Sequence, residues 1–243
     1  MTVKTYAATE SDAQRNRLVW MQNIDEEVSY WRDVLDGKER LSGEINWRLD
    51  PATELDNAHQ QALGPVDAGQ IPSVLDVGAG PLTPVGKSLN GRRIRLVAVD
   101  PLADAYNELL DERKIIPTIR TRFAEGERLQ DRFPPDSFDL VTSSNSIDHS
   151  YDPLSYVDSM LSVVKPGKNV LVIGCINEGQ HAQYHGLHQW NMDASQGRLE
   201  FWQPQGQRMA VAEVLKDKVV SEQMIFPHPY GDRWFASILK KRG

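Results

Sequence analysis

A glycine-rich turn with the residue types of a ligand-binding loop follows an early apolar segment. The segment reads Val74-Leu-Asp-Val77, and the turn reads Gly78-Ala-Gly80-Pro-Leu-Thr83. Glycines in such a turn let the backbone approach a ligand closely, and a helix that begins after it offers free N–H groups. Glycine turns also occur where the chain only needs a tight reversal, so this turn needs support from a second feature.

The second feature is an acidic residue at the end of the next apolar segment. Asp100 follows Ile94–Val99 at about 20 residues from the glycines, where a carboxylate is expected to accept hydrogen bonds from ribose hydroxyls. A nicotinamide-binding fold shares both features, but its Gly-x-Gly-x-x-Gly fingerprint needs glycine at the position of Thr83. Pro81 and Pro84 also make the loop a poor cradle for a pyrophosphate, so a nicotinamide oxidoreductase is disfavoured.

Several segments, in order, resemble the motifs of the class I methyltransferases that use S-adenosylmethionine (SAM), especially the ubiquinone- and menaquinone-biosynthesis-like group. They are Val74–Gly80, Val97–Asp100, Phe123–Leu129 with Asp136–Val141, and Leu161–Gly167. The resemblance covers about residues 72–176 and the C-terminal strand pair. It implies a Rossmann-like fold, SAM as cofactor and methyl transfer as reaction. Leu82 departs from the pattern, because it stands where the family usually has a third glycine.

The resemblance also implies which residues contact the cofactor. They are Asp76, Gly78, Ala79, Gly80, Asp100, Pro101, Leu102, Glu125, Gly126 and Asn145. Asp100 would hold the ribose and Leu102 would touch the adenine. Glu125 and the Gly126 N–H would read the adenine edge, and Asp76 would orient the loop or meet the cofactor's ammonium group.

A polar segment, Ser143–Pro153, follows the predicted strand Phe138–Thr142 at the expected mouth of the pocket. Asn145 could bind the methionine moiety of the cofactor. His149 is our candidate general base, because histidine titrates near neutral pH, and Asp148 beside it could bind the substrate's hydroxyls. The alternative is that His149 is a helix-start residue that packs under the cofactor.

A second group of polar and aromatic side chains follows the fifth predicted strand. Tyr184, His185, His188 and Trp190 are the candidate substrate contacts, since aromatic faces stack on sugar rings. His181 and His185 have a spacing that could bind a transition metal on a helix. We expect no transition metal at the three histidines, because a polar loop of this kind more often contacts substrate.

These residues favour O-methylation of a polar, glycan-like small molecule. In some sugar O-methyltransferases carboxylates hold a divalent ion, and Asp148 or Glu178 could hold magnesium (Mg²⁺) in that way. The alternatives are methylation of quinone or aromatic oxygen or nitrogen, and a SAM-binding protein without catalysis. The oligomeric state stays open, a homodimer being one option.

Alternating strands and helices must position these residues. From residue 72, strands are expected at Val74–Val77, Ile94–Val99, Ile115–Arg122, Phe138–Thr142 and Val170–Ile173. Helices are expected from Thr83-Pro84, over Leu102–Arg113, after Asp152-Pro153 as far as the turn Lys165-Pro166-Gly167, and over Met209–Leu215. Val219–Phe226 and Arg233–Lys240 are expected to form an antiparallel pair at one edge.

The predicted fold is therefore α/β, a Rossmann-like, doubly wound and mostly parallel sheet of seven strands. Residues 1–70 are interpreted as an N-terminal helical cap, with a helix over Ile24–Leu35 whose apolar stripe includes Trp31. Residues 71–243 are interpreted as the SAM-binding domain, with a substrate-facing insertion at about 176–207. We expect the Trp31 stripe to be core, with a substrate pocket as the alternative.

Composition limits the partners. The net charge is -7, and lysines and arginines are scattered, so nucleic acid is a poor candidate. No apolar run approaches the roughly 20 residues that span a bilayer, and residues 1–10 lack a hydrophobic signal segment. We therefore expect a cytoplasmic protein without a membrane partner. Cys175, the only cysteine, is expected to be a buried apolar residue.

Overall fold

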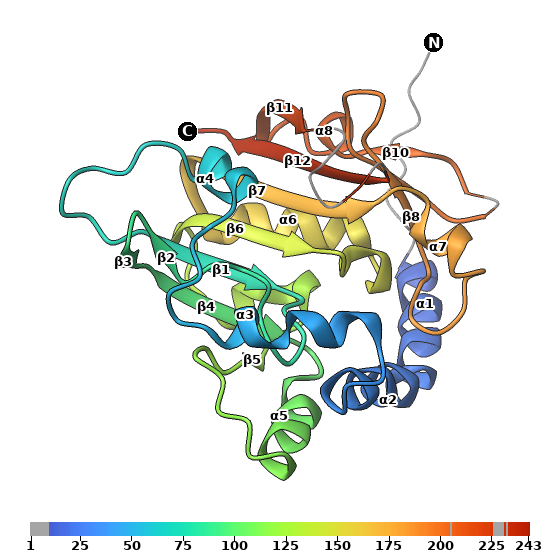
Figure 1. The fold of residues 1–243 in the computed structure, drawn as a ribbon. Coiled ribbons are helices and arrows are strands. Elements are labelled where there is room, and N and C mark those ends of the chain that lie inside the picture. Colours follow the sequence, from blue (N-terminus) through green and yellow to red (C-terminus); the bar gives the residue numbers. More distant parts are fainter. Residues whose placement is uncertain (1–9, 205, 226–230, 232) are drawn as a thin grey trace.

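A seven-stranded sheet lies at the centre of the computed structural model, which describes residues 10–204, 206–225, 231 and 233–243. The strand order is β11-β12-β7-β6-β1-β4-β5 (Figure 1). The strands are β1 (Ser73–Val77), β4 (Arg95–Asp100), β5 (Arg122–Phe123), β6 (Phe138–Ser144), β7 (Val164–Cys175), β11 (Val219–Ile225) and β12 (Trp234–Lys241). Strands β5, β4, β1, β6 and β7 pair in parallel, and β12 is antiparallel to both β7 and β11. The predicted Rossmann-like sheet with a C-terminal antiparallel pair is confirmed.

Alternate residues of the central strands pack on opposite faces of the sheet. Leu75 and Val141 face a core that includes α6 (Pro153–Val163), whereas Val74 and Leu140 face a core that includes α4 (Asn57–Leu63). Successive side chains of a strand point to opposite faces, so two helical layers enclose the sheet. Both faces are buried, which explains the nearly continuous apolar runs in the sequence.

The N-terminal part is helical, with α1 (Glu10–Gln22), α2 (Ile24–Leu35), η1 (Arg40–Glu44) and α3 (Ile45–Leu49). The predicted helix Ile24–Leu35 is confirmed. Its apolar stripe packs against Leu102, Tyr106 and Leu109, of which the last two belong to α5 (Ala103–Glu112). Figure 1 shows α1 and α2 at the end of the sheet toward which β1, β6 and β7 point. The cap therefore lies where a parallel sheet binds its ligands.

The predicted helix after Thr83-Pro84 is wrong. The chain continues without a helix into β2 (Ser88–Leu89), which pairs with β3 (Arg92–Arg93). The backbone N–H groups of Lys87 and Ser88 donate to the Thr53 carbonyl at 2.7 and 3.1 Å. These bonds to the N-terminal segment replace the bonds within a helix.

The predicted strand Ile115–Arg122 is wrong over most of its length, since β5 contains only Arg122–Phe123. Pro117 cannot donate to a strand ladder, and Ile116 is 88% exposed. The Thr118 hydroxyl instead donates to the Leu49 carbonyl at 2.5 Å. The connection thus runs along the cap.

Two further boundaries differ from the expectation. The predicted turn Lys165-Pro166-Gly167 lies inside β7, where the pairing with β6 changes register. The predicted helix Met209–Leu215 is shortened to α8 (Val211–Val214), because β10 (Met209–Ala210) pairs with β9 (Glu200–Trp202). Phe226, the last residue of a predicted strand, lies outside the described residues.

The region 176–207 contains α7 (Glu178–His181), β8 (Asn191–Asp193) and β9. Strands β8, β9 and β10 form a small antiparallel sheet. Met192 and Phe201 are fully buried in the same core as α6, so this small sheet is attached firmly to the main one. In the part of the chain that the structure describes, no helix is long and apolar enough to cross a membrane.

Candidate SAM and acceptor site

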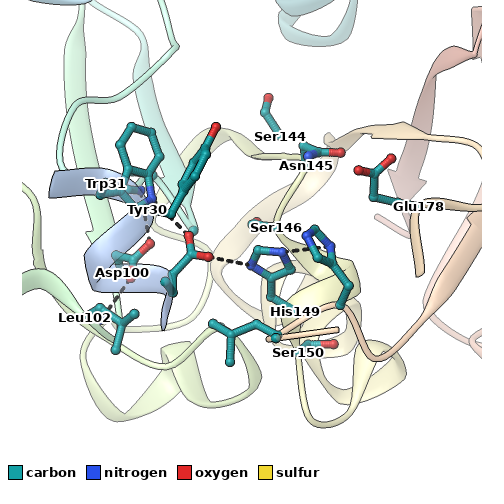
Figure 2. Close-up of a pocket in the computed structure, with 18 of the residues that line it drawn as sticks. Tyr30, Trp31, Asp100, Leu102, Ser144, Asn145, Ser146, His149, Ser150 and Glu178 are labelled. Carbon is teal, nitrogen blue, oxygen red and sulfur yellow. Dashed lines mark hydrogen bonds and ion pairs between the residues drawn. The ribbon is translucent and has the colours of Figure 1, made fainter. Parts of the chain in front are cut away.

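A cavity of about 760 Å³ lies at the carboxyl ends of the parallel strands, beneath the cap. This volume is within the range of cofactor and substrate sites. Of the predicted site residues, those that line it are Gly78, Ala79, Gly80, Asp100, Pro101, Leu102, Glu125, Gly126, Asn145, His149, His185 and His188. Figure 2 shows Trp31 and Asp100 toward one side of the cavity, Asn145 and Glu178 toward the other, and His149 between them. One cavity thus contains most of the predicted contacts.

The glycine turn has the backbone conformation that glycine permits. Gly78 and Gly80 have φ angles of +74° and +63°. A Cβ at Gly78 would lie 2.2 Å from Ser146 Oγ, and a Cβ at Gly80 would lie 2.8 Å from Trp31 Cζ2. Both glycines are therefore required by close neighbours as well as by conformation.

Asp100 joins the glycine turn to the end of β4. Its Oδ2 accepts from the Gly80 N–H at 3.0 Å, and its Oδ1 accepts from the Leu102 N–H at 2.8 Å. Burial raises the pKa of Asp100 to about 7, although these two N–H groups act in the opposite direction. Each carboxylate oxygen keeps a lone pair for a further donor, which suits the two hydroxyls of a ribose.

One side chain at the predicted methionine end of the cavity has an acceptor without a hydrogen-bond partner. Asn145 Oδ1 is buried and has no hydrogen-bond partner among the described residues. An ammonium group at this position would supply the missing donor. The residues of this cavity therefore fit SAM at its ribose and methionine ends.

Asp76 lies behind the glycine turn and does not line the cavity. Its Oδ2 accepts from the Thr83 hydroxyl at 2.6 Å, and burial raises its pKa to about 6. This contact favours the interpretation that Asp76 orients the loop. Leu82 is also buried, and its carbonyl accepts from Arg48 Nη1 at 2.7 Å.

Glu125, at the predicted adenine end of the cavity, contacts both the cap and the segment that precedes α6. Its Oε1 forms an ion pair with Arg17 of α1 at 2.7 Å, and its Oε2 accepts from the Tyr151 hydroxyl at 3.0 Å. The neighbouring Glu127, which sequence reasoning missed, accepts from the Tyr151 N–H at 3.0 Å. Burial raises the pKa of Glu127 to about 8.

Asp148, His149 and His188 form a compact cluster in the cavity wall. His188 Nδ1 lies 2.6 Å from Asp148 Oδ2 and 3.1 Å from His149 Nε2, and His149 Nε2 lies 3.5 Å from the same Asp148 oxygen. Asp148 is fully buried, whereas the two histidines reach the cavity. Sequence reasoning named all three residues but did not bring His188 to the other two.

The cluster is electrostatically coupled. Burial alone would raise the pKa of Asp148, but the adjacent His149 and the hydrogen bond from His188 outweigh it and lower that pKa. Burial alone would lower the pKa of His188, but the hydrogen bond and charge of Asp148 outweigh it and raise that pKa. The arrangement thus stabilises a positive charge next to a buried carboxylate.

Two of the predicted substrate contacts do not line the cavity. Trp190 is buried in the core and its Nε1 donates to the Ser150 carbonyl at 2.9 Å. Tyr184 is 36% exposed, and its hydroxyl accepts from Asn191 Nδ2 at 2.8 Å. Trp190 thus attaches the insertion to the segment of Ser150, and Tyr184 joins two parts of the insertion. His185, in contrast, reaches the cavity and pairs with Glu26 at 2.9 Å.

The cap contributes a wall that sequence reasoning mostly missed. Its cavity-lining side chains include Trp20, Glu27, Tyr30, Trp31, Trp47 and Arg48. Trp31 both packs on Tyr106, with ring centroids 6.1 Å apart, and lines the cavity. The apolar stripe of the helix was the sequence feature that indicated a role for Trp31, since a stripe that packs on a domain can also border its ligand site.

A protein-family model described as a methyltransferase domain matches residues 28–210. The chain therefore belongs to the methyltransferase domain family, and its fold is that of the class I SAM-dependent methyltransferases. Family membership sets aside the nicotinamide oxidoreductase. The match does not distinguish subgroups, so the ubiquinone- and menaquinone-biosynthesis-like group stays a prediction.

Solved structures share this fold at low sequence identity. The CurJ carbon methyltransferase is similar with a TM-score of 0.57 and 11% identity, over 95% of this chain and 71% of that chain. A chain from the complex of the Haloferax volcanii Trm112 methyltransferase activator has a TM-score of 0.51 and 14% identity, over 87% and 96% of the two chains. No curated protein sequence matches the chain.

Proposed function

We propose that the protein transfers the methyl group of SAM to an oxygen of a small, polar, glycan-like acceptor, with His149 as general base. The observation that carries the proposal is the cluster of Asp148, His149 and His188 beside the glycine turn and Asp100. A hydroxyl acceptor gains from a base near its proton, whereas a neutral amine needs little beyond positioning. The cluster therefore favours oxygen over nitrogen.

The side chains of the cluster have different roles in methyl transfer. SAM, when bound, supplies a methyl group on a sulfonium that is already electrophilic. His149 Nε2 is directed at Asp148 and His188, which leaves Nδ1 to accept the proton of a hydroxyl. The buried Asp148 carboxylate then balances the positive charge of the imidazolium.

The rest of the wall supports an acceptor rich in hydroxyls. Glu26, Glu178 and His185 line the cavity and offer hydrogen-bonding groups. Tyr30 and Trp47 present aromatic rings to the same space. Carboxylates accept hydrogen bonds from hydroxyls, and aromatic faces suit the apolar faces of sugar rings.

A screen with SAM that carries an isotopically labelled methyl group tests the proposal. Glycosides, quinones, other phenols and amines are each incubated with the protein, and mass spectrometry locates the label. The proposal expects the label on an oxygen of a hydroxylated, sugar-like acceptor. Label on nitrogen or carbon would contradict it, and tight SAM binding without transfer to any class would favour a non-catalytic SAM-binding protein.

A further inference from the structure

Three potential ligand atoms converge in the cavity wall. Asp148 Oδ2, His149 Nε2 and His188 Nδ1 all lie within 4.8 Å of one another. We infer that these three side chains form a binding site for one divalent transition-metal ion. The inference rests on the proposed function for the reaction and the acceptor, but it gives His149 the role of a metal ligand in place of a base. Binding itself can be measured without turnover.

The three ligand atoms converge on one point instead of forming a linear chain of hydrogen bonds. In a linear proton relay the two ring nitrogens of a histidine serve different partners. Here the same atom, His188 Nδ1, faces both Asp148 Oδ2 at 2.6 Å and His149 Nε2 at 3.1 Å. A single N–H cannot point well at both partners, whereas a common ion can satisfy all three atoms.

The separations suit a small ion. Ligand atoms about 2.0–2.2 Å from zinc, at tetrahedral or octahedral angles, lie roughly 3.0–3.5 Å apart. The distances of 3.1 and 3.5 Å to His149 Nε2 are of this size. Only the 2.6 Å contact between Asp148 and His188 needs to open slightly.

The donor set points to a transition metal. Two imidazole nitrogens and one carboxylate are a common set for zinc and for non-haem iron, whereas magnesium prefers oxygen ligands. Asp148 Oδ1 is buried without a hydrogen-bond partner among the described residues, so the carboxylate has a second oxygen to offer. The site is therefore more suitable for zinc, iron or cobalt than for magnesium.

The surroundings hold the ligands and add negative charge. Glu27 Oε2 lies 4.0 Å from His149 Nδ1, the position where a carboxylate typically orients a metal-bound histidine. The N–H groups of Gln189 and Trp190 donate to the Asp148 carbonyl at 2.9 and 3.2 Å, which fixes the loop of His188 against Asp148. The site is thus preorganised by backbone bonds.

The open side of the cluster faces the cavity. The side chains of His149 and His188 are 19% and 28% exposed, and that of Asp148 is fully buried. Three protein ligands with an open position are typical of catalytic rather than structural sites. The open position would take an oxygen of the acceptor, whose proton a bound ion makes more acidic. His149 would then act as a ligand through Nε2 and not as the base, and the proton of the ion-bound hydroxyl would pass to water in the cavity.

Titration of the untagged, chelator-treated protein with Co²⁺ and Zn²⁺ tests the inference. We expect one ion per chain by calorimetry, and visible Co²⁺ absorption bands that change on binding. His149→Ala and His188→Ala should weaken metal binding by more than the 10- to 100-fold typical of an orienting residue. Glu27→Gln should weaken metal binding by a factor within that range. His181→Ala is the matched control, since His181 is an exposed histidine outside the cluster, and should bind as wild type.

Asp148→Asn preserves the volume of the side chain while removing its charge, so it tests the role of this ligand with less risk of misfolding. Circular dichroism checks that each variant is folded. Failure of folded wild-type protein to bind either ion stoichiometrically would overturn the inference. Binding that survives in folded His149→Ala and His188→Ala would overturn it as well. The proposed function would be unaffected by either result if label still reached an oxygen of the acceptor.

Discussion

The backbone N–H of Gly80 donates to Asp100 Oδ2 over 3.0 Å, so the glycine turn and the carboxylate at the end of β4 form one unit. The two residues are far apart in sequence, but β1 and β4 are adjacent parallel strands. A ligand that bonds to Asp100 therefore also contacts the turn. This relationship supports the predictions on cofactor binding.

Asp100→Ala should weaken SAM binding by about 1.5–3 kcal/mol, because hydrogen bonds to a charged group are worth that much. Isothermal titration calorimetry measures the change. Asp111→Ala, at an exposed carboxylate of α5 paired with Arg120, serves as control and should bind SAM normally. Unchanged affinity in folded Asp100→Ala would contradict the assignment of the ribose contact.

Gly80→Ala should lose stability and SAM affinity together. A Cβ there would lie 2.8 Å from the Trp31 indole, and the positive φ angle costs about 1–3 kcal/mol for a residue with a side chain. Gly37→Ala is the matched control, because Gly37 has a φ of +81° but nothing within 4 Å of a Cβ. Gly37→Ala should lower the stability of the protein without lowering its affinity for SAM.

The contact with Trp31 can be isolated by a second substitution. Trp31→Leu should make room and recover part of the stability that Gly80→Ala loses, as measured by a double-mutant cycle. An additive result would mean that Trp31 does not restrict position 80.

The fold was largely predictable, because the strands that carry the site are continuous apolar runs with polar ends. Val74–Val77, Ile94–Val99 and Phe138–Thr142 bring Gly78, Asp100 and Asn145 to one edge, as the order of parallel strands requires. The missing helix after Thr83 was not predictable. The N–H groups of Lys87 and Ser88 bond to the Thr53 carbonyl, and nothing in the local sequence reveals such a distant partner.

The site was predictable where it depends on strand ends and less so where it depends on chain folding. His188 reaches Asp148 because backbone bonds from Gln189 and Trp190 hold the insertion on η3 (Ile147–His149). Trp190 looked like a substrate contact, since an aromatic residue in a polar segment gives no sign of which way it faces. Glu27 was hidden among other acidic residues of an amphipathic helix.

Thermal stability should fall as the pH rises from about 5 to about 8. Burial raises the pKa values of Asp76, Asp100 and Glu127 to about 6, 7 and 8. Such groups bind more protons in the folded state than in the unfolded state. Their contribution to stability is therefore complete below their unfolded-state pKa values near 4, and it is lost as the pH rises past their folded-state pKa values. Melting temperatures across this range measure the effect, and Glu127→Gln should flatten its upper part. A rise in melting temperature over the same range would contradict these pKa directions.

His149→Ala tests the central claim most directly, in an assay with the acceptor found by the screen and SAM affinity measured in parallel. The proposed role predicts a kcat lower by roughly 10²–10⁴, the usual contribution of a positioned base, with SAM affinity nearly unchanged. His181→Ala should match wild type in both measurements. A His149→Ala variant with near wild-type kcat would contradict the claim, and loss of SAM binding in that variant would assign His149 to the cofactor site instead.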